Sequence, residues 1–408
     1  MSRKKIILLL LVCATGLVLG TSHRVPANPN GGLTPTEELG KALFFDSSLS
    51  TPPGQSCAFC HGPEVGFTGP VSSINAGTVV YPGAVHTRFG NRKPPAASYG
   101  GDTPVLHFDA GEGVWIGGVF WDGRATGWTL GDPLAEQAQG PFLNPLEQNN
   151  PNPQIVCNKV RAGAYAALFE QVWGPGSLDC VKDIAGTYER IARSIAAYER
   201  SSEVNPFSSK YDAVLRGEAE LTPQEAEGLA LFAGKGNCSA CHVSEGERPL
   251  FTDFTYDNLG VPKNPANPFY RMPRRWNPAG EQWVDLGLGD FLKGQGYAPA
   301  VYEPEMGKVR VPSLRNVDLR PAPDFVKAYA HNGYFKSLKA IVHFYNTRDV
   351  LPVCTSSSQT PGVDCWPEPE VPINVNRDEL GNLGLTDAEE DAIVAFMKTL
   401  SDGYVAGF

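Results

Sequence analysis

The strongest constraint on this chain is a short segment that occurs twice, each time followed by the same cysteine motif. Residues 33–44 read LTPTEELGKALF and residues 221–232 read LTPQEAEGLALF, with eight of the twelve positions identical. Threonine, proline and a glutamate three residues after the threonine form a typical helix start in both copies. Because such a start is common, the weight of the repeat comes from the CxxCH motif that follows each copy. Together they predict two copies of one module.

The two motifs are Cys57-Ala-Phe-Cys60-His61 and Cys238-Ser-Ala-Cys241-His242. Two thiols three residues apart lie along one helical turn and can bond both vinyl groups of a haem, while the following histidine offers its imidazole to the iron. A zinc site built from both pairs and a thioredoxin-like redox pair are the alternatives. A histidine directly after the second cysteine, in both copies, favours haem. The sequence therefore predicts two covalently bound haem c groups, with His61 and His242 as iron ligands.

The rest of the chain alternates between helix patterns and irregular stretches. Residues 183–201 and 386–400 have the apolar spacing of amphipathic helices, and each closes one half of the chain. Glycine (44) and proline (35) make up nearly a fifth of the 408 residues, which implies many loops. We expect a mainly α fold with two cytochrome c-like haem domains, residues 27–203 and 204–408, wrapped in long irregular loops.

The beginning of the sequence has the pattern of an export signal. Basic residues Arg3, Lys4 and Lys5 precede an apolar run over residues 6–19, which is short for a membrane span. We expect a signal peptide over residues 1–22 that is cleaved during export to the periplasm or another compartment outside the cytoplasm; an uncleaved anchor is the alternative. The formal net charge of −10 argues against nucleic acid as a partner.

Four cysteines remain outside the signal, which holds Cys13, and outside the two motifs. An oxidising compartment favours two disulfides among these four. The local pairings are the simplest, but the sequence leaves the other two connectivities open. The local pairs are Cys157–Cys180 and Cys354–Cys365.

From about residue 33 to residue 400 the chain resembles the bacterial di-haem cytochrome c peroxidase family, which includes the methylamine-utilisation protein MauG. The resemblance is carried by FWDGRA at 120–125, EQAxGP at 136–141, VPSLRN at 311–316 and HNG at 331–333. It implies that peroxide reacts at the haem of the first domain. The haem of the second domain then serves electron transfer.

The matching positions imply roles for individual residues. Trp121 is expected to lie between the haems and to help electrons cross. Gln137 and Pro141 would line the peroxide pocket, and Glu147, six residues past Pro141, would move a proton during O–O cleavage. His86 is implied as a removable ligand of the first iron, although its match is offset by one residue; a histidine of a surface loop is the alternative.

Two positions depart from the usual peroxidase pattern. Tyr345 stands fourteen residues after His331, where the peroxidases typically place methionine and MauG places tyrosine. The resemblance therefore implies Tyr345 as the distal ligand of the second haem, with Met306 and His343 as competitors. A phenolate favours ferric iron over ferrous iron. Lys93 stands where the family often has an asparagine for calcium, which puts a bound calcium ion in doubt.

Three functions follow from these residues. The leading one is a peroxidase that reduces hydrogen peroxide with electrons from a small c-type cytochrome or similar donor protein. The second is a MauG-like oxidase that modifies tyrosine or tryptophan side chains of a partner protein; Tyr345 favours it and His86 disfavours it. The third is a non-catalytic electron-transfer cytochrome, against which Glu147 argues. The resemblance also leaves a homodimer open.

Overall fold

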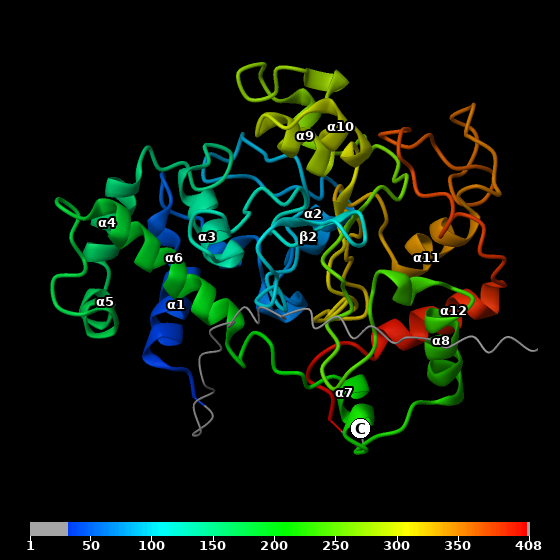
Figure 1. Cartoon of the computed structure of the whole chain (residues 1–408), viewed down its shortest axis with the longest axis horizontal. Helices are drawn as coiled ribbons and strands as arrows, with labels where there is room; N and C mark the ends of the chain where they lie inside the picture. Colours follow the sequence, from blue (N-terminus) through cyan, green and yellow to red (C-terminus); the bar gives the residue numbers. More distant parts are fainter. Residues whose placement is uncertain (1–31, 406–408) are drawn as a thin grey trace, which may run out of the picture. The chain divides into compact units, whose positions relative to one another are not determined.

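The helices fall into two groups, with long irregular segments between and around them (Figure 1). The computed structural model describes residues 32–405 of the chain. The predicted signal segment, residues 1–22 with Cys13, lies outside the described residues. The described chain is mainly helical and carries two small sheets, so the predicted fold class is confirmed. None of the helices within residues 32–405 has the length and apolar character that a bilayer crossing requires.

The first group of helices surrounds a core in the N-terminal half of the chain. It consists of α1 (Pro35–Phe45), α3 (Pro133–Leu143), α4 (Pro153–Ala162), α5 (Ala166–Trp173) and α6 (Ile184–Arg200). The predicted helix start is present, because the Thr34 side chain accepts from the Glu37 amide and the Glu37 carboxylate accepts from the Thr34 amide. Apolar residues of α1 and α6 meet in one buried cluster that includes Leu39, Leu43, Phe44, Ile191, Ile195 and Tyr198.

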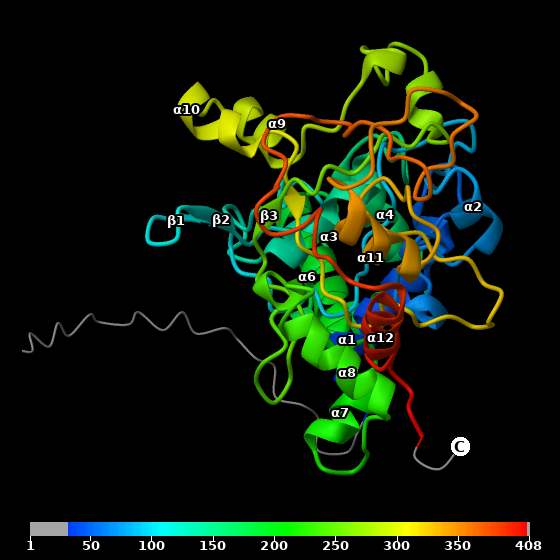
Figure 2. The same ribbon diagram turned by 90° about the vertical axis from the view of Figure 1, so that its right-hand side faces the viewer.

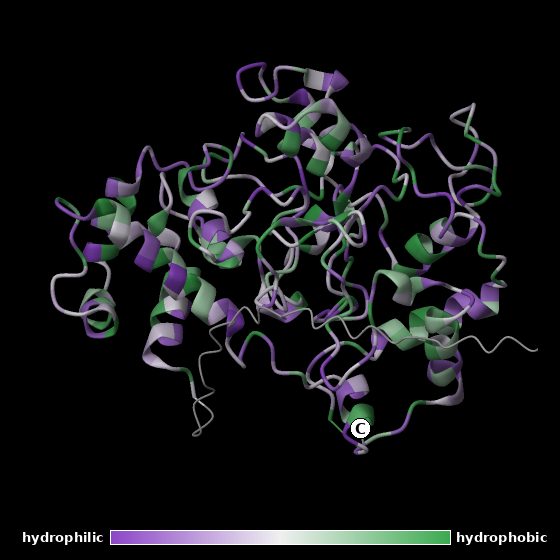
Figure 3. Ribbon diagram, viewed as in Figure 1, coloured by the Kyte–Doolittle hydropathy of each residue, from purple (hydrophilic) through white to green (hydrophobic). Residues whose placement is uncertain are grey.

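The second group repeats this arrangement in the C-terminal half. It consists of α7 (Lys210–Leu215), α8 (Pro223–Ala233), α11 (Leu338–Thr347) and α12 (Asp387–Lys398). Capping boxes begin α8 at Thr222 and α12 at Thr386. Figure 3 shows hydrophobic and hydrophilic residues interleaved along these helices, as expected where one face lies in a core. That core includes Phe232, Phe251, Phe344, Ile393 and Phe396.

A glycine marks the crossing point of each helix pair. A Cβ atom added at Gly40 of α1 would lie 1.9 Å from the carbonyl oxygen of Ser194 in α6. One added at Gly228 of α8 would lie 1.9 Å from the carbonyl oxygen of Ala392 in α12. The two pairs therefore cross at the same point of the repeated segment, and each crossing leaves no room for a side chain.

The remaining elements are short and lie outside the two helix groups. The strand β1 (His107–Asp109) pairs antiparallel with β2 (Val114–Ile116), and β3 (Tyr256–Asp257) pairs antiparallel with β4 (Val309–Arg310). Figure 2 shows the β1–β2 hairpin and the helices α9 and α10 at the same side of the molecule. The other short helices are α2 (Ser72–Ala76), α9 (Gly287–Gly294), α10 (Pro299–Tyr302) and the 3-10 turns Ser47–Leu49, Pro63–Val65, Pro268–Arg271, Gly280–Gln282 and Glu303–Glu305.

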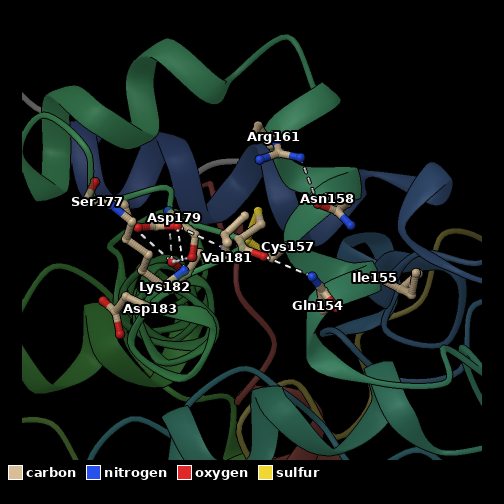
Figure 4. Close-up of a disulfide and its surroundings, with 12 residues drawn as sticks. Gln154, Ile155, Cys157, Asn158, Arg161, Ser177, Asp179, Val181, Lys182 and Asp183 are labelled. Carbon is tan, nitrogen blue, oxygen red and sulfur yellow. Dashed lines mark hydrogen bonds between the residues drawn. A yellow bond between two sulfur atoms is a disulfide. The ribbon is translucent and has the colours of Figure 1, made fainter.

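Two disulfides close loops, and both are the local pairs that the sequence favours. Cys157 is bonded to Cys180, and Cys354 is bonded to Cys365. Around the first bond, Gln154 donates from Nε2 to the carbonyl oxygen of Cys180 at 3.2 Å (Figure 4). The bond ties the segment after α5 to α4, and Thr187 of α6 also holds this segment through hydrogen bonds to the carbonyl oxygens of Ser177 and Asp179.

We predict that Gly40→Ala destabilises the haem-loaded protein by about 1–3 kcal/mol, because the new methyl group must push α1 away from α6. Chemical denaturation followed by circular dichroism measures the change. Gly294→Ala in α9 is the control, since an added Cβ there has no neighbour within 4 Å. We expect it to be neutral or slightly stabilising, because alanine favours helix over glycine. Equal stability of both variants would contradict the tight crossing.

Candidate functional site

Each CxxCH motif folds into one short turn. Cys57–Phe59 and Cys238–Ala240 are 3-10 helices. The amide of His61 donates to the carbonyl oxygen of Cys57 at 3.0 Å, and the amide of His242 donates to that of Cys238 at 2.9 Å. Both thiols and the imidazole of each motif therefore start from the same turn, as covalent haem attachment requires.

The two histidines are oriented by equivalent hydrogen bonds. Nδ1 of His61 lies 3.0 Å from the carbonyl oxygen of Phe67, and Nδ1 of His242 lies 2.8 Å from that of Phe251. Both phenylalanines have left-handed backbone, with φ of 56° and 54°. An Nδ1–H that donates to a carbonyl leaves Nε2 as the nitrogen for a metal. Burial lowers the pKa of both histidines, which favours the neutral imidazole that binds iron.

The four thiols do not have the character of a reactive dithiol. All four are free, and burial raises the pKa of each, to about 12 for Cys238 and Cys241. Redox-active cysteine pairs instead have a lowered pKa. The two pairs also line different cavities, so they do not form one zinc site. Within residues 32–405 no group of three or more His, Cys, Asp or Glu side chains could hold a metal ion.

The first cavity brings together most of the residues expected at the peroxide site. Its empty space is about 1700 Å³, open mouth included. Its lining includes Cys57, Cys60, His61, Trp121, Gln137, Pro141 and Glu147. His86 is not part of this lining; it is exposed on the loop that follows Pro82. A ligand role for His86 would need that loop to move, and it stays a prediction.

Glu147 reaches the first cavity from the loop after α3. Its amide donates to the carbonyl oxygen of Asn144 at 3.0 Å, and its own carbonyl oxygen accepts from the Ala84 amide at 2.8 Å. Two loops therefore hold its backbone. Burial raises the pKa of the Glu147 carboxyl, and the nearby Arg124 guanidinium opposes that shift. Such a carboxyl keeps its proton to higher pH than an exposed glutamate.

One of the three candidate ligands of the second haem lines the second cavity, and the other two do not. Its empty space is about 1520 Å³, and its lining includes Cys238, Cys241, His242, Trp121 and Tyr345. Met306 and His343 are not part of it. His343 uses Nδ1 with a Glu390 carboxylate oxygen at 2.9 Å and Nε2 with the Gly362 carbonyl oxygen at 3.0 Å. Of the three candidates, Tyr345 is therefore the one that faces the cavity.

Trp121 belongs to a wall that the two cavities share. The residues that line both are Lys93, Ala96, Trp121, Arg310, Pro312 and Ser313. The indole Nε1 of Trp121 donates to the carbonyl oxygen of Lys93 at 2.9 Å, and the amide of Arg310 donates to the carbonyl oxygen of Trp121 at 2.9 Å. These two bonds fix the indole between the cavities.

Several buried polar atoms in the two linings have no hydrogen-bond partner. In the first cavity they include the acceptors Gln55 Oε1, Gln148 Oε1 and Glu199 Oε2, and in the second they include Arg315 Nη2 and both ring nitrogens of His331. The donor Arg310 Nε belongs to a residue that lines both cavities. The unpaired guanidinium donors of Arg310 and Arg315 fit a large apolar ring with an anionic edge, because carboxylate groups of such a ligand can accept their hydrogen bonds. The sequence offers one signal for Glu199: it lies four residues after Ile195, on the buried face of α6.

Two cavities, each with a pair of free thiols and an oriented imidazole at its wall, define a di-haem c-type cytochrome. The family model "Di-haem cytochrome c peroxidase" matches residues 34–220. The chain is 37% identical over 371 residues to the methylamine utilization protein MauG of Paracoccus denitrificans, which covers 89% of this chain and 88% of that protein. It is 28% identical to the cytochrome-c peroxidase IdrP1 of Denitromonas iodatirespirans, over 94% of this chain and 86% of that one.

A solved structure extends the similarity to the fold. The diheme peroxidase BthA from Burkholderia thailandensis E264 superposes with a TM-score of 0.74 at 34% identity, covering 92% of this chain and 87% of that one. The chain belongs to the di-haem cytochrome c peroxidase family. It is accordingly an oxidoreductase that carries two covalently bound haem c groups.

We predict two c-type haems per chain by pyridine haemochrome analysis, and one after the double change Cys238→Ser with Cys241→Ser, because each cavity has its own thiols. The double change Cys354→Ser with Cys365→Ser is the control, since that disulfide does not line either cavity. We expect two haems in the control. A haem count that does not fall in the first variant would contradict this attachment.

Proposed function

We propose that the enzyme reduces hydrogen peroxide to water in the first cavity, with electrons from a small c-type cytochrome or similar donor that enter through the second. The observation that supports this proposal most is the asymmetry of the linings. Gln137 and Glu147 line the first cavity and not the second, although both cavities have the same thiol and histidine motif. The bound haem supplies the redox chemistry that breaks the O–O bond.

The protein residues handle the protons of this reaction. Reduction of one peroxide to two waters consumes two electrons and two protons. In the proposal Glu147 passes a proton to the departing oxygen, because its raised pKa keeps it protonated to higher pH than usual. The Gln137 side chain, which α3 presents to the same cavity, orients the peroxide by hydrogen bonding.

Electrons reach the first cavity across the shared wall. Trp121 is proposed as the bridge, since it lines both cavities and its indole is fixed at Lys93. Tyr345 is proposed as the distal ligand of the second iron. A phenolate there would favour the ferric state. The domains proposed for the two haems are residues 27–203 for the peroxidatic haem and 204–408 for the electron-transfer haem. We also propose export to the periplasm, with the signal peptide removed.

A MauG-like oxidation of tyrosine or tryptophan side chains in a partner protein is the second candidate. The observation that favours it is Tyr345, which lines the second cavity where Met306 does not. The two candidates differ in the source of electrons. A peroxidase consumes a reduced cytochrome in proportion to peroxide, whereas the oxidase draws its electrons from the partner protein.

We predict that Glu147→Gln lowers peroxide turnover with a reduced small cytochrome by about 100-fold or more, because an amide cannot donate and recover the proton. Stopped-flow oxidation of the cytochrome measures the rate. Glu112→Gln in the exposed β1–β2 turn has the same chemical change away from both cavities and should keep the parent rate. An unchanged rate in Glu147→Gln would remove this residue from the reaction.

We predict that Tyr345→Phe alters the ferric electron paramagnetic resonance signal and the absorption spectrum of one haem only. The reason is that Tyr345 is, of the three candidate ligands, the residue that lines the second cavity. Met306→Leu is the control and should leave both spectra unchanged. An unaltered spectrum in Tyr345→Phe, or a change in Met306→Leu, would assign the ligand elsewhere.

A further inference from the structure

The cationic side chains around the two cavities fall into two kinds. The first kind is paired with carboxylates. Arg92 binds Asp122 and Asp285 at 2.5 and 2.6 Å, Arg124 binds Asp122 at 3.0 Å, and Arg315 binds Asp212 at 2.6 Å. The second kind has no acidic partner within residues 32–405. It comprises Lys93, Arg310 and Lys327.

The two lysines of this second kind are held by neutral oxygens. Nζ of Lys93 donates to the hydroxyl of Thr68 and the carbonyl oxygen of Pro94, both at 3.1 Å. Nζ of Lys327 donates to three carbonyl oxygens at 2.8–2.9 Å, and the residue is only 5% exposed. The carbonyl oxygens around Lys327 belong to Val65, Asn316 and Leu319.

Arg310 completes the set in the wall that both cavities share. One of its guanidinium nitrogens donates to the Thr103 hydroxyl at 2.7 Å, while its buried Nε has no partner. Its backbone amide holds the carbonyl oxygen of Trp121, as the Lys93 carbonyl oxygen holds the indole. The two cationic residues of the shared wall therefore also position Trp121.

Three cations in one buried region are costly unless a negative charge offsets them. Burial lowers the pKa of Lys93 to about 8, and burial next to Lys93 lowers the pKa of Lys327 well below its usual value. Within residues 32–405 no carboxylate forms a salt bridge with these two ammonium groups, and Asp318, the acidic group near Lys327, is bound to Arg320. The cofactor of the family supplies further negative charge, because each haem carries two propionate groups.

We propose that Lys93, Arg310 and Lys327 form a shared cationic wall that provides the counter-charge for the haem propionates and raises the reduction potentials of the haems. A nearby positive charge favours the added electron of the ferrous state. Lys93 lines both cavities and acts on both haems, whereas Lys327 lines only the second and acts on that haem alone. This inference rests on the two haems and not on which substrate they oxidise or reduce.

Three matched substitutions test this difference by spectroelectrochemical titration of the haem-loaded protein, with the two haems told apart by their ferric paramagnetic resonance signals. Lys93→Met should lower the midpoint potentials of both haems, and Lys327→Met should lower that of the second haem only. Lys336→Met is the control. Nζ of Lys336 also donates to two carbonyl oxygens, those of Asn75 and Gly333 at 2.8 and 2.9 Å, but the residue lines neither cavity. Its loss should shift neither potential.

The charge itself, and not the packing, is tested by Lys93→Arg, which should keep both potentials near the parent values. Unchanged potentials in a folded Lys93→Met protein with two haems would overturn the proposal. If Lys93→Met fails to take up haem, Lys327→Met decides alone, because a shift at both haems or at neither contradicts the proposed assignment. Unchanged potentials would contradict the role proposed for these lysines even if peroxide turnover were lost. Such a result would not contradict the proposal that the enzyme is a peroxidase.

Discussion

The hydrogen bond from each motif histidine to a phenylalanine carbonyl oxygen is the interaction on which both sites depend. It fixes Nδ1 of His61 at Phe67 and Nδ1 of His242 at Phe251, and so directs Nε2 for iron binding. Each carbonyl is presented by a left-handed backbone turn, which needs support from the surrounding structure. The helix pairs α1–α6 and α8–α12 supply part of this support, because Phe67 and Phe251 pack in the cores that these pairs enclose.

The two cavities have the same scaffold but different linings. Tyr198 and Phe396 occupy matching places, since the Cβ of each lies 2.9 Å from the Cβ that would be added at the facing crossing glycine. The next residue of each helix lines its cavity: Glu199 in the first and Met397 in the second. Burial raises the pKa of Glu199 to about 8 and also raises the pKa of Glu147, so both carboxyls of the first cavity keep their protons to higher pH than exposed glutamates. In the function that we propose, the repeated fold serves proton-coupled chemistry in one half and electron transfer in the other.

The wall between the cavities couples the two halves. It contains Trp121, which is fixed by the backbones of Lys93 and Arg310, and it carries the positive charges of those same two residues. In the roles that we propose, one set of residues both carries electrons between the haems and raises their reduction potentials. The wall forms only when segments around residues 93, 121 and 310 meet, so it depends on packing between the two halves of the chain.

The local sequence determined the features that depend on short spacing. The helix starts at Thr34 and Thr222 and the two CxxCH turns follow from residues that are close along the chain. For the disulfides the sequence favoured the local pairs but left two other connectivities open, and the structure has the local pairs. Only the tertiary structure shows which of Tyr345, Met306 and His343 lines the second cavity, because this depends on which distant segments the fold brings to its wall. The same is true of Glu199 and of the cations without acidic partners. Some of their neighbours are hundreds of residues away in the chain, as Val65 is from Lys327, and a single sequence does not reveal which distant side chains share a buried wall.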